Sequence, residues 1–147
     1  MFNSFDISAS GMTAQRLRMD IIADNIANVE TTRTVDGLPY RRKLAVFQER
    51  STTPFREFLK KKMGESAGTG SEGVQVVGIT EDPSPFKMIY NPGHPDANEE
   101  GYVAMPNVDI VSEMVDMISA SRAYEANITV LNTAKSMAMR ALEIGRG

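Results

Sequence analysis

Few residues in this 147-residue chain have a type and spacing that could carry out chemistry. The single histidine, His94, lies between Gly93 and Pro95 and could act as an acid/base group or a metal ligand. Either role needs carboxylates at suitable spacing on a regular element, and none is found, so we interpret His94 as a plain loop residue. The chain has no cysteine, which excludes disulfides, thiolate zinc sites and thiol catalysis.

Two other stretches have the composition of binding sites. The glycine-rich segment 64–73 lacks the Gly-Lys-Ser/Thr of a phosphate loop and follows no apolar strand, so we interpret it as a flexible linker. Arg41, Arg42 and Lys43 could contact phosphate, but the net charge is -3 and no basic stripe continues along the chain. The sequence therefore predicts no catalytic residue, no cofactor, no metal site and no nucleic-acid partner.

Charge is unevenly distributed in the middle of the chain. Residues 30–62 hold nine Lys/Arg against four Asp/Glu, whereas residues 63–109 hold one lysine against eight acids. Complementary halves of this kind pair either within one fold or between copies, where head-to-tail contact would build a filament. The sequence leaves both alternatives open.

The strongest structural signal is a heptad pattern over residues 109–144, typical of a long helix that packs lengthwise on another helix. At about 1.5 Å per residue this helix would be about 54 Å long, whereas a small domain is about 30 Å across. It therefore needs a partner beyond its own domain, and its polar breaks at Ser121 and Lys135 are candidate contacts with a neighbour. The pattern consists of Met114, Met117, Ser121, Tyr124, Ile128, Leu131, Lys135, Ala138 and Leu142.

A second helix is predicted over residues 4–29, with two apolar stripes that should be buried on more than one side. Gly11 indicates close approach of a neighbouring helix, and Asn25 and Asn28 are expected to close the helix in the left-handed conformation. The two stripes are Phe5, Met12, Met19 and Ile26, and Ile7, Ala14 and Ile21.

The middle of the chain is predicted to be a small β region. A loop over 30–39, with a turn at Asp36-Gly37, leads to strands at 40–48, 74–80, 86–90 (returning along the second strand) and 101–105, and a short helical turn is expected from Phe55. The fold class is α+β: the long N- and C-terminal helices pair as an antiparallel coiled coil, with the β-rich middle at one end. The expected domains are 1–30, 31–108 (flexible at about 50–73) and 109–147.

Several motifs carry a family resemblance. Those at the start are Ser10-Gly11-Met12-x-Ala14-Gln15-x-x-Arg18 and Ala23-Asp24-Asn25-Ile26-Ala27-Asn28-Val29-x-Thr31, and later ones are 90–98, 100–110 and 119–127. Together they resemble the bacterial flagellar axial proteins, the family of rod, hook and hook-associated proteins. The usual Thr-x-Gly plus an aromatic is replaced here by Thr31-Thr32-Arg33-Thr34, which is similar to the proximal-rod members. The resemblance covers nearly the whole chain except about 50–73.

The resemblance implies a structural subunit of the flagellar basal-body proximal rod. Such a subunit would polymerise through its terminal helices into the hollow drive shaft that transmits motor torque and surrounds the export channel. The implied partners are other copies of the chain, the rod proteins FlgB, FlgF and FlgG, FliE, and the flagellar type III export apparatus, within the basal body in the cell envelope. The N-terminus lacks the basic and apolar regions of a cleaved signal peptide. The chain contains no run of about 18 apolar residues, so no membrane insertion is expected.

The expected assembly contacts lie on the two helices. The alternative function is a non-polymerising helical-hairpin adaptor that binds one partner helix. An enzyme is disfavoured, because no carboxylate pair, triad, metal cluster or phosphate loop is recognisable. The expected contact residues are Met12, Gln15, Arg18, Ile22, Asn25 and Asn28 in the first helix, and Met114, Met117, Ser121, Tyr124, Ile128, Leu131 and Lys135 in the second.

Overall fold

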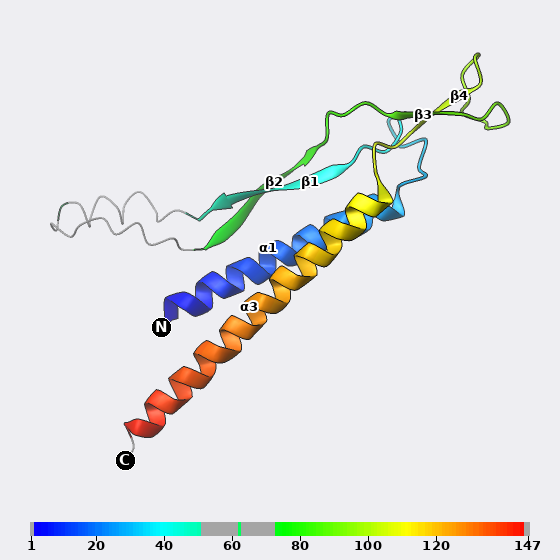
Figure 1. Ribbon diagram of the computed structural model, residues 1–147. Coiled ribbons are helices and arrows are strands. Elements are labelled where there is room, and N and C mark those ends of the chain that lie inside the picture. The colour runs from blue at the N-terminus through cyan, green and yellow to red at the C-terminus, as the bar shows by residue number, and fades with distance from the viewer. Residues whose placement is uncertain (1, 51–61, 63–72, 146–147) are drawn as a thin grey trace.

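Two long helices dominate the computed structural model, which describes residues 2–50, 62 and 73–145. Helix α1 spans Phe2–Ala27 and helix α3 spans Ile110–Ile144. They lie side by side and run in opposite directions, so that the start of α1 and the end of α3 point the same way (Figure 1). The predicted α+β fold with an antiparallel coiled coil of terminal helices is confirmed.

Helix α3 extends beyond α1. Gly11 of α1 lies against Asn127 of α3. Phe2 precedes Gly11 by about two and a half turns, so it is level with about position 136 of α3. Residues 137–144 therefore project past the start of α1 (Figure 1). With 35 residues at about 1.5 Å each, α3 is about 52 Å long, as the heptad pattern predicts.

Two antiparallel strand pairs form the described part of the middle. Strand β1 (Lys43–Glu49) pairs with β2 (Val74–Glu81), and β3 (Lys87–Tyr90) pairs with β4 (Tyr102–Met105). All four predicted strands are confirmed, but the expectation that β3 returns along β2 is wrong. The seven-residue β1 pairs with the eight-residue β2, and the four-residue β3 pairs with the four-residue β4.

Strand β1 begins at Lys43 rather than at position 40, because the preceding residues form other hydrogen bonds. The Tyr40 N–H donates to the Thr31 carbonyl at 3.0 Å, and the Arg42 N–H donates to Asn107 Oδ1 at 2.8 Å. The loop before them contains the predicted turn, in which Gly37 has a φ of 76°. The N–H groups of residues 40 and 42 therefore connect the strands to other elements, although the Arg42 carbonyl still accepts from the Asp82 N–H at 2.8 Å, next to the ladder.

Helix α1 is covered on two sides, as its two apolar stripes predict. It packs against α3 on one side and against β1 and β2 on the other. Ala14 and Ile21 of the second stripe are buried, whereas Ile7 is 37% exposed. The Val74 N–H donates to the Ser10 hydroxyl at 3.1 Å. The β1–β2 pair thus lies alongside the helices, so placing the whole middle at their end was wrong; only β3–β4 lies there (Figure 1).

The hydrophobic core is small. Many large apolar side chains, including eleven on α3, are more than a third exposed. Contiguous exposed apolar surface of this kind marks interaction sites in soluble proteins. The buried hydrophobic residues among those described are Ala14, Ile21, Ile22, Tyr40, Val103, Val108 and Ala120.

The remaining sequence expectations concern the segment around residues 50–73, His94 and membrane insertion. The helical turn expected from Phe55 lies outside the described residues, as does the flexible segment of about 50–73 apart from positions 50, 62 and 73. His94 lies in a turn between β3 and β4, as expected, and its Nδ1 accepts from the Asp96 N–H at 3.1 Å. Within the described ranges, neither helix is apolar enough over a sufficient length to cross a membrane.

Candidate assembly interface

A buried polar cluster joins α1, α3 and the start of β1. Glu113, in the first turn of α3, is fully buried. Its Oε1 accepts a hydrogen bond from Arg42 Nε at 2.5 Å, and its Oε2 accepts one from Asn25 Nδ2 at 3.1 Å. A buried carboxylate is costly unless it is paired and its remaining oxygen is satisfied, and here both oxygens have donors. We call Glu113, Arg42, Asn25 and Tyr40 the junction cluster.

Asn25 connects the junction cluster to the strand. Its Nδ2 also donates to the Lys43 carbonyl, and its Oδ1 accepts from the Lys43 N–H, both at 2.9 Å. The Tyr40 hydroxyl lies 3.0 Å from Asn25 Oδ1 and 3.1 Å from Asp24 Oδ2. Burial, followed by the charge of Asp24 and its hydrogen bond, raises the pKa of Tyr40. The protonated phenol is therefore the form that the fold stabilises.

The expectation that Asn25 and Asn28 close the helix in the left-handed conformation is wrong. No described residue other than glycine has a positive φ. Asn25 is only 1% exposed and its amide is used by the strand and by Glu113, so it remains helical. Asn28 closes the helix differently, because its Nδ2 donates to the Asp24 carbonyl at 2.9 Å.

Arg42 extends the cluster to the surface of α3. Asp116 accepts from Arg42 through Oδ2 at 3.2 Å and from Arg18 through Oδ1 at 3.0 Å. Arg42 also lies 3.7 Å from Asp82, whose pKa is held below its usual range by hydrogen bonds from Ser84 and then by the charge of Arg42. The planar guanidinium has five donors in a fixed fork, so it can bind several carboxylates at once with defined geometry.

Other cations of the basic half also pair inside the chain. Arg41 stacks over Phe86 at 4.5 Å from the ring centre and donates to the Asp82 carbonyl at 3.0 Å. Lys43 Nζ lies 3.1 Å from Asp24 Oδ2. Among the described residues, two pairs link the basic half to the acidic half, Arg42 with Asp82 and the weaker Arg33–Asp96 contact at 3.9 Å. These residues therefore pair within one fold, which is one of the two alternatives that the sequence left open; the other was pairing between copies.

The two helices approach each other closely at Gly11. A Cβ at this position would lie 2.9 Å from Asn127 Oδ1, too close for an unaltered side chain. Asn127 is itself held by a bond from its Nδ2 to the Ala123 carbonyl at 2.8 Å. The predicted close approach at Gly11 is confirmed.

The expected contact residues in the first helix divide by burial. Ile22 and Asn25 are buried within the chain, and the other four are half-buried. Gln15 is notable because its buried Oε1 has no hydrogen-bond donor among the described residues. The half-buried residues are Met12, Gln15, Arg18 and Asn28.

The expected contact residues in α3 divide by position along the heptad. Met117, Tyr124 and Leu131 are half-buried and belong to the side that faces α1, whereas Met114, Ile128 and Lys135 are exposed and Ser121 is half-buried. The side of α3 that faces α1 is therefore rotated slightly about the helix axis relative to the predicted heptad stripe. Some residues of that stripe face α1 and others lie outside the contact. The residues on that side are Glu113, Met117, Ala120, Tyr124, Asn127, Leu131, Ala134 and Ala138.

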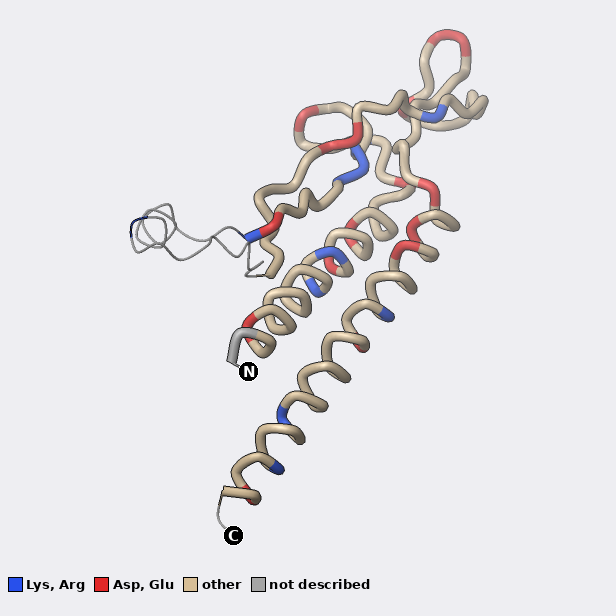
Figure 2. Tube along the Cα trace, turned by 60° about the vertical axis from the view of Figure 1, so that its left-hand side comes forward, with Lys and Arg blue, Asp and Glu red and all other residues tan. Residues whose placement is uncertain are grey.

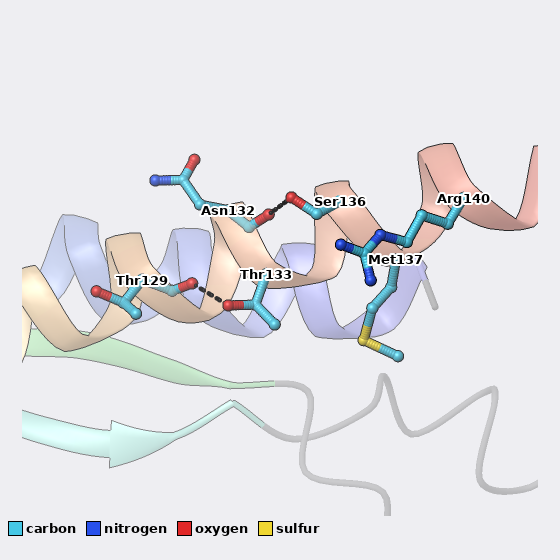
Figure 3. A pocket seen from close by; sticks show the side chains of 6 residues that line it. All are labelled: Thr129, Asn132, Thr133, Ser136, Met137 and Arg140. Carbon is cyan, nitrogen blue, oxygen red and sulfur yellow. Dashed lines mark hydrogen bonds between the residues drawn. The ribbon is translucent and has the colours of Figure 1, made fainter.

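The face of α3 opposite α1 changes character along its length. Over its first two turns it carries a stripe of four large apolar side chains, which are 55% to 69% exposed. From Arg122 onward, the same helical spacing carries mostly polar side chains, and Figure 3 shows six residues around a shallow depression on this side, of which Met137 is the one apolar member. Hydroxyls there bond back to the helix, from Thr129 to Glu125, Thr133 to Thr129 and Ser136 to Asn132. The apolar set is Val111, Met114, Val115 and Ile118, and the polar set is Arg122, Glu125, Thr129, Asn132, Thr133, Ser136, Arg140 and Glu143.

Sequence reasoning missed Glu113, Tyr40 and Arg42 as a cluster. A usable signal was present, because Glu113 lies on an otherwise apolar helical stripe, four residues before Met117. Among the residues that the structure describes, no group of His, Asp or Glu side chains is arranged to hold a metal ion. The geometry is that of a helix pair fastened to a strand, with unfilled apolar surface on α3.

Comparison with known proteins defines the class. Residues 5–33 match the family "Flagella basal body rod protein", and residues 99–144 match "Flagellar basal body rod FlgEFG protein C-terminal". These two segments contain most of α1 and α3 together with β4. The helix pair is therefore the flagellar rod type, and the resemblance to flagellar axial proteins is confirmed.

Relatives over the full length narrow the class to one family. Flagellar basal-body rod protein FlgC of Bacillus subtilis (strain 168) is 50% identical, with 99% of this chain and 98% of the relative covered. FlgC of Borreliella burgdorferi is 49% identical, covering 100% and 99%, and FlgC of Escherichia coli O6:H1 is 42% identical, covering 99% and 98%. The chain belongs to the FlgC family of flagellar basal-body rod proteins.

Proposed function

We propose that this chain is a structural subunit of the proximal rod, with no catalytic role. It polymerises through α1 and α3 into the hollow drive shaft that transmits motor torque and surrounds the export channel. Segments 1–30 and 109–147 form the inner part of the shaft wall, and 31–108 forms the outer part. Its partners are other copies of itself, FlgB, FlgF, FlgG and FliE, and the flagellar type III export apparatus delivers it to the basal body without a cleaved signal peptide.

The observation that carries this proposal is the exposed apolar surface of α3. A monomer of this size should bury most of its large apolar side chains, yet Val111, Val115 and Leu142 are each more than 60% exposed. Burial of such surface contributes roughly 25 cal/mol per Å2, so association is the expected outcome. Met114, Ser121, Ile128 and Lys135 would then face neighbouring subunits, while the half-buried Met117 and Tyr124 serve the pairing with α1.

The polar half of the outward face of α3 fits the wall of a channel. A channel that passes other chains should offer few groups to which they could adhere. The hydroxyls of Thr129, Thr133 and Ser136 donate to carbonyls of their own helix. Figure 3 shows the bonds of Thr133 and Ser136. A side chain satisfied in this way offers little for a passing chain to bind.

The junction cluster fits a part that carries torque. Arg42 and Asn25 tie both helices to the first strand through directional hydrogen bonds, several of them charge-assisted. Force applied to the middle of the chain would therefore pass directly to the helix pair. A flexible connection would absorb part of a rotation instead of transmitting it.

Sedimentation and electron microscopy of the purified full-length chain test the proposal. We expect concentration-dependent particles in which the terminal helices surround a hollow centre. Removing residues 1–28 is a poor test, because α1 also covers β1 and β2. A full-length chain that stays monomeric at every concentration and binds a single partner helix would favour the helical-hairpin adaptor.

A further inference from the structure

Strand β1 has one edge that no other described strand covers. The Arg42 carbonyl just before β1 and the Arg50 N–H just after it bond to residues that flank β2, at 2.8 Å and 2.9 Å. Backbone groups alternate in direction along an antiparallel strand, so the even-numbered residues of β1 bond to β2 and the odd-numbered ones face away from it. The N–H and C=O groups of Ala45 and Phe47 therefore point outward, where they have no hydrogen-bond partner among the described residues.

A side chain already imitates a strand at the first position of this edge. The amide of Asn25 bonds to both the N–H and the C=O of Lys43, each at 2.9 Å, as a residue of a neighbouring strand would. Beside the edge lies a groove of about 300 Å³, lined by Asn25, Ala45 and Phe47 together with side chains of α1 and α3. An open strand edge beside a groove is a site at which an extended segment can add as a further strand.

Strand β3 has an open outer edge of its own. The Asn91 N–H donates to the Gly101 carbonyl at 2.9 Å, so the same alternation directs the backbone groups of Met88 and Tyr90 away from β4. No described residue bonds to these groups. The side chains of Met88, Ile89 and Tyr90 are 57%, 49% and 65% exposed. This strand therefore has both unpaired backbone groups and uncovered apolar side chains.

The outer edges of β2 and β4 are partly blocked. The Val74 N–H of β2 donates to the Ser10 hydroxyl of α1 at 3.1 Å. On β4, Tyr102 bonds to Asn98 through both its carbonyl and its N–H, at 2.9 Å and 2.8 Å. The β3–β4 pair also projects beyond the helix pair, so it can approach another copy (Figure 1). Among the described strands, β3 is therefore the best suited to enter the groove of a second copy.

Charge favours an antiparallel arrangement of the two strands. Residues 91–101, which follow β3, carry three acids and no lysine or arginine, whereas residues 41–43 at the start of β1 are all basic. Figure 2 shows the acids of this turn and the bases at the start of β1. In an antiparallel pair the end of β3 lies beside the start of β1, so the acidic turn would meet the bases. A parallel pair would place the turn beside Glu49 and Arg50, whose charges offset each other.

We propose that β3 of one copy adds to the free edge of β1 in the next copy, antiparallel, with Tyr90 opposite Ala45 and Met88 opposite Phe47. This inference rests on the proposed function, because it specifies one contact of the polymer. The large Tyr90 side chain then lies beside a small one, and the sulfur of Met88 can contact the ring of Phe47. The two edges differ, so the contact is heterologous and leaves one of each edge free for further copies.

Disulfide cross-linking between two single variants tests the contact, because the chain has no cysteine of its own. In the proposed register Val46 lies opposite Ile89, with Cα atoms about 4.5 Å apart, which a disulfide can span. Both side chains are exposed, by 41% and 49%. Mild oxidation of an equal mixture of Val46→Cys and Ile89→Cys chains should give the mixed dimer. Each chain has a single cysteine, so every bond formed joins two copies.

The matched control mixes Ile89→Cys with Ile79→Cys, whose position is 54% exposed and lies opposite Ala45 on β2. We expect at least about tenfold more mixed dimer from the Val46→Cys mixture, corresponding to a preference of about 1.4 kcal/mol. A chain that assembles by sedimentation but gives no excess over the control overturns this contact and leaves the proposed polymer intact. A chain that stays monomeric and forms no mixed dimer overturns both.

A proline substitution tests the contact without a covalent bond. Ala45→Pro removes an outward N–H and leaves the hydrogen bonds between β1 and β2 in place, because that N–H does not face β2. It should raise the concentration needed for assembly at least about tenfold. Ile79→Pro removes the outward N–H at the opposite position of β2 and should not alter that concentration. Thermal unfolding checks that both variants fold, and equal effects on assembly would contradict the role assigned to the free edge of β1.

Discussion

Replacing Glu113 by glutamine should destabilise the chain far more than its similarity in size suggests. The two carboxylate oxygens face two donors, Arg42 Nε and Asn25 Nδ2. A glutamine at position 113 has one acceptor oxygen, and its NH2 group would have to face one of these donors. The variant therefore loses one hydrogen bond, gains a donor–donor contact and leaves the Arg42 charge less compensated.

The magnitude follows from the burial of the group. Hydrogen bonds to charged groups contribute about 1.5–3 kcal/mol, and removing one partner of a buried ion pair costs about 3–5 kcal/mol. Glutamine keeps one acceptor, and Arg42 keeps Asp116 and Asp82, so we expect a loss of about 2–4 kcal/mol. For a chain of this length, the midpoint of thermal unfolding should fall by about 5–15 °C.

Urea unfolding followed by far-ultraviolet circular dichroism measures this loss. The slope of the unfolding free energy against urea should not change, because the surface exposed on unfolding is the same. The control is Glu125→Gln, the same substitution on the exposed polar half of α3, which should change stability by less than about 0.5 kcal/mol. If Glu113→Gln were no more destabilising than Glu125→Gln, the structural role assigned to the junction cluster would be refuted.

Three further variants test other contacts. Gly11→Ala should gain about 1 kcal/mol of helix propensity only when Asn127→Ala has removed the side chain in its way, so a double-mutant cycle by thermal unfolding should show coupling. Tyr40→Phe should cost about 1 kcal/mol and remove the last phenol to ionise in a spectrophotometric titration. Because the folded pKa of Tyr40 is raised, its contribution is present below about pH 10 and lost as pH rises through the folded value. The pKa of Asp82 is lowered, so the advantage of the native chain over Asp82→Asn should be present above about pH 4 and vanish as pH falls through the folded value.

The helices and strands could be predicted because their signals are local and repeated. The heptad spacing of α3 recurs over several turns, so one misplaced residue does not alter the assignment. The rotation of the predicted stripe has a physical cause. Ala120 and Ala134 face α1, and their small side chains allow the close approach that Gly11 also permits. A prediction based on the size of apolar side chains therefore placed the larger Ile128 and Met114 in the helix contact instead of the alanines.

The junction cluster could not be predicted, because its members are far apart in the sequence. Arg42 and Asn25 meet Glu113 across 71 and 88 positions, and a charged residue on a helix has no local feature that identifies its partner. The position of β1 beside α1 depends on the same contacts, since Asn25 binds the backbone of Lys43. Sequence patterns indicated that the second stripe of α1 is covered, but not by which strands.

A repeated heptad pattern allows a helix pair to slide by whole turns, and the junction cluster removes that freedom. A slip of one turn would move Glu113 about 5.4 Å from Asn25 and leave a buried carboxylate without its donors. No comparable cost would arise from the alanines and leucines along the same side. The cluster therefore selects one register of α1 against α3, and that register determines how far residues 137–144 project past the start of α1. An assembly built on that projection would need this register in every subunit. A buried charge that fixes the register would meet this need, whereas an apolar residue would stabilise the pair without specifying it.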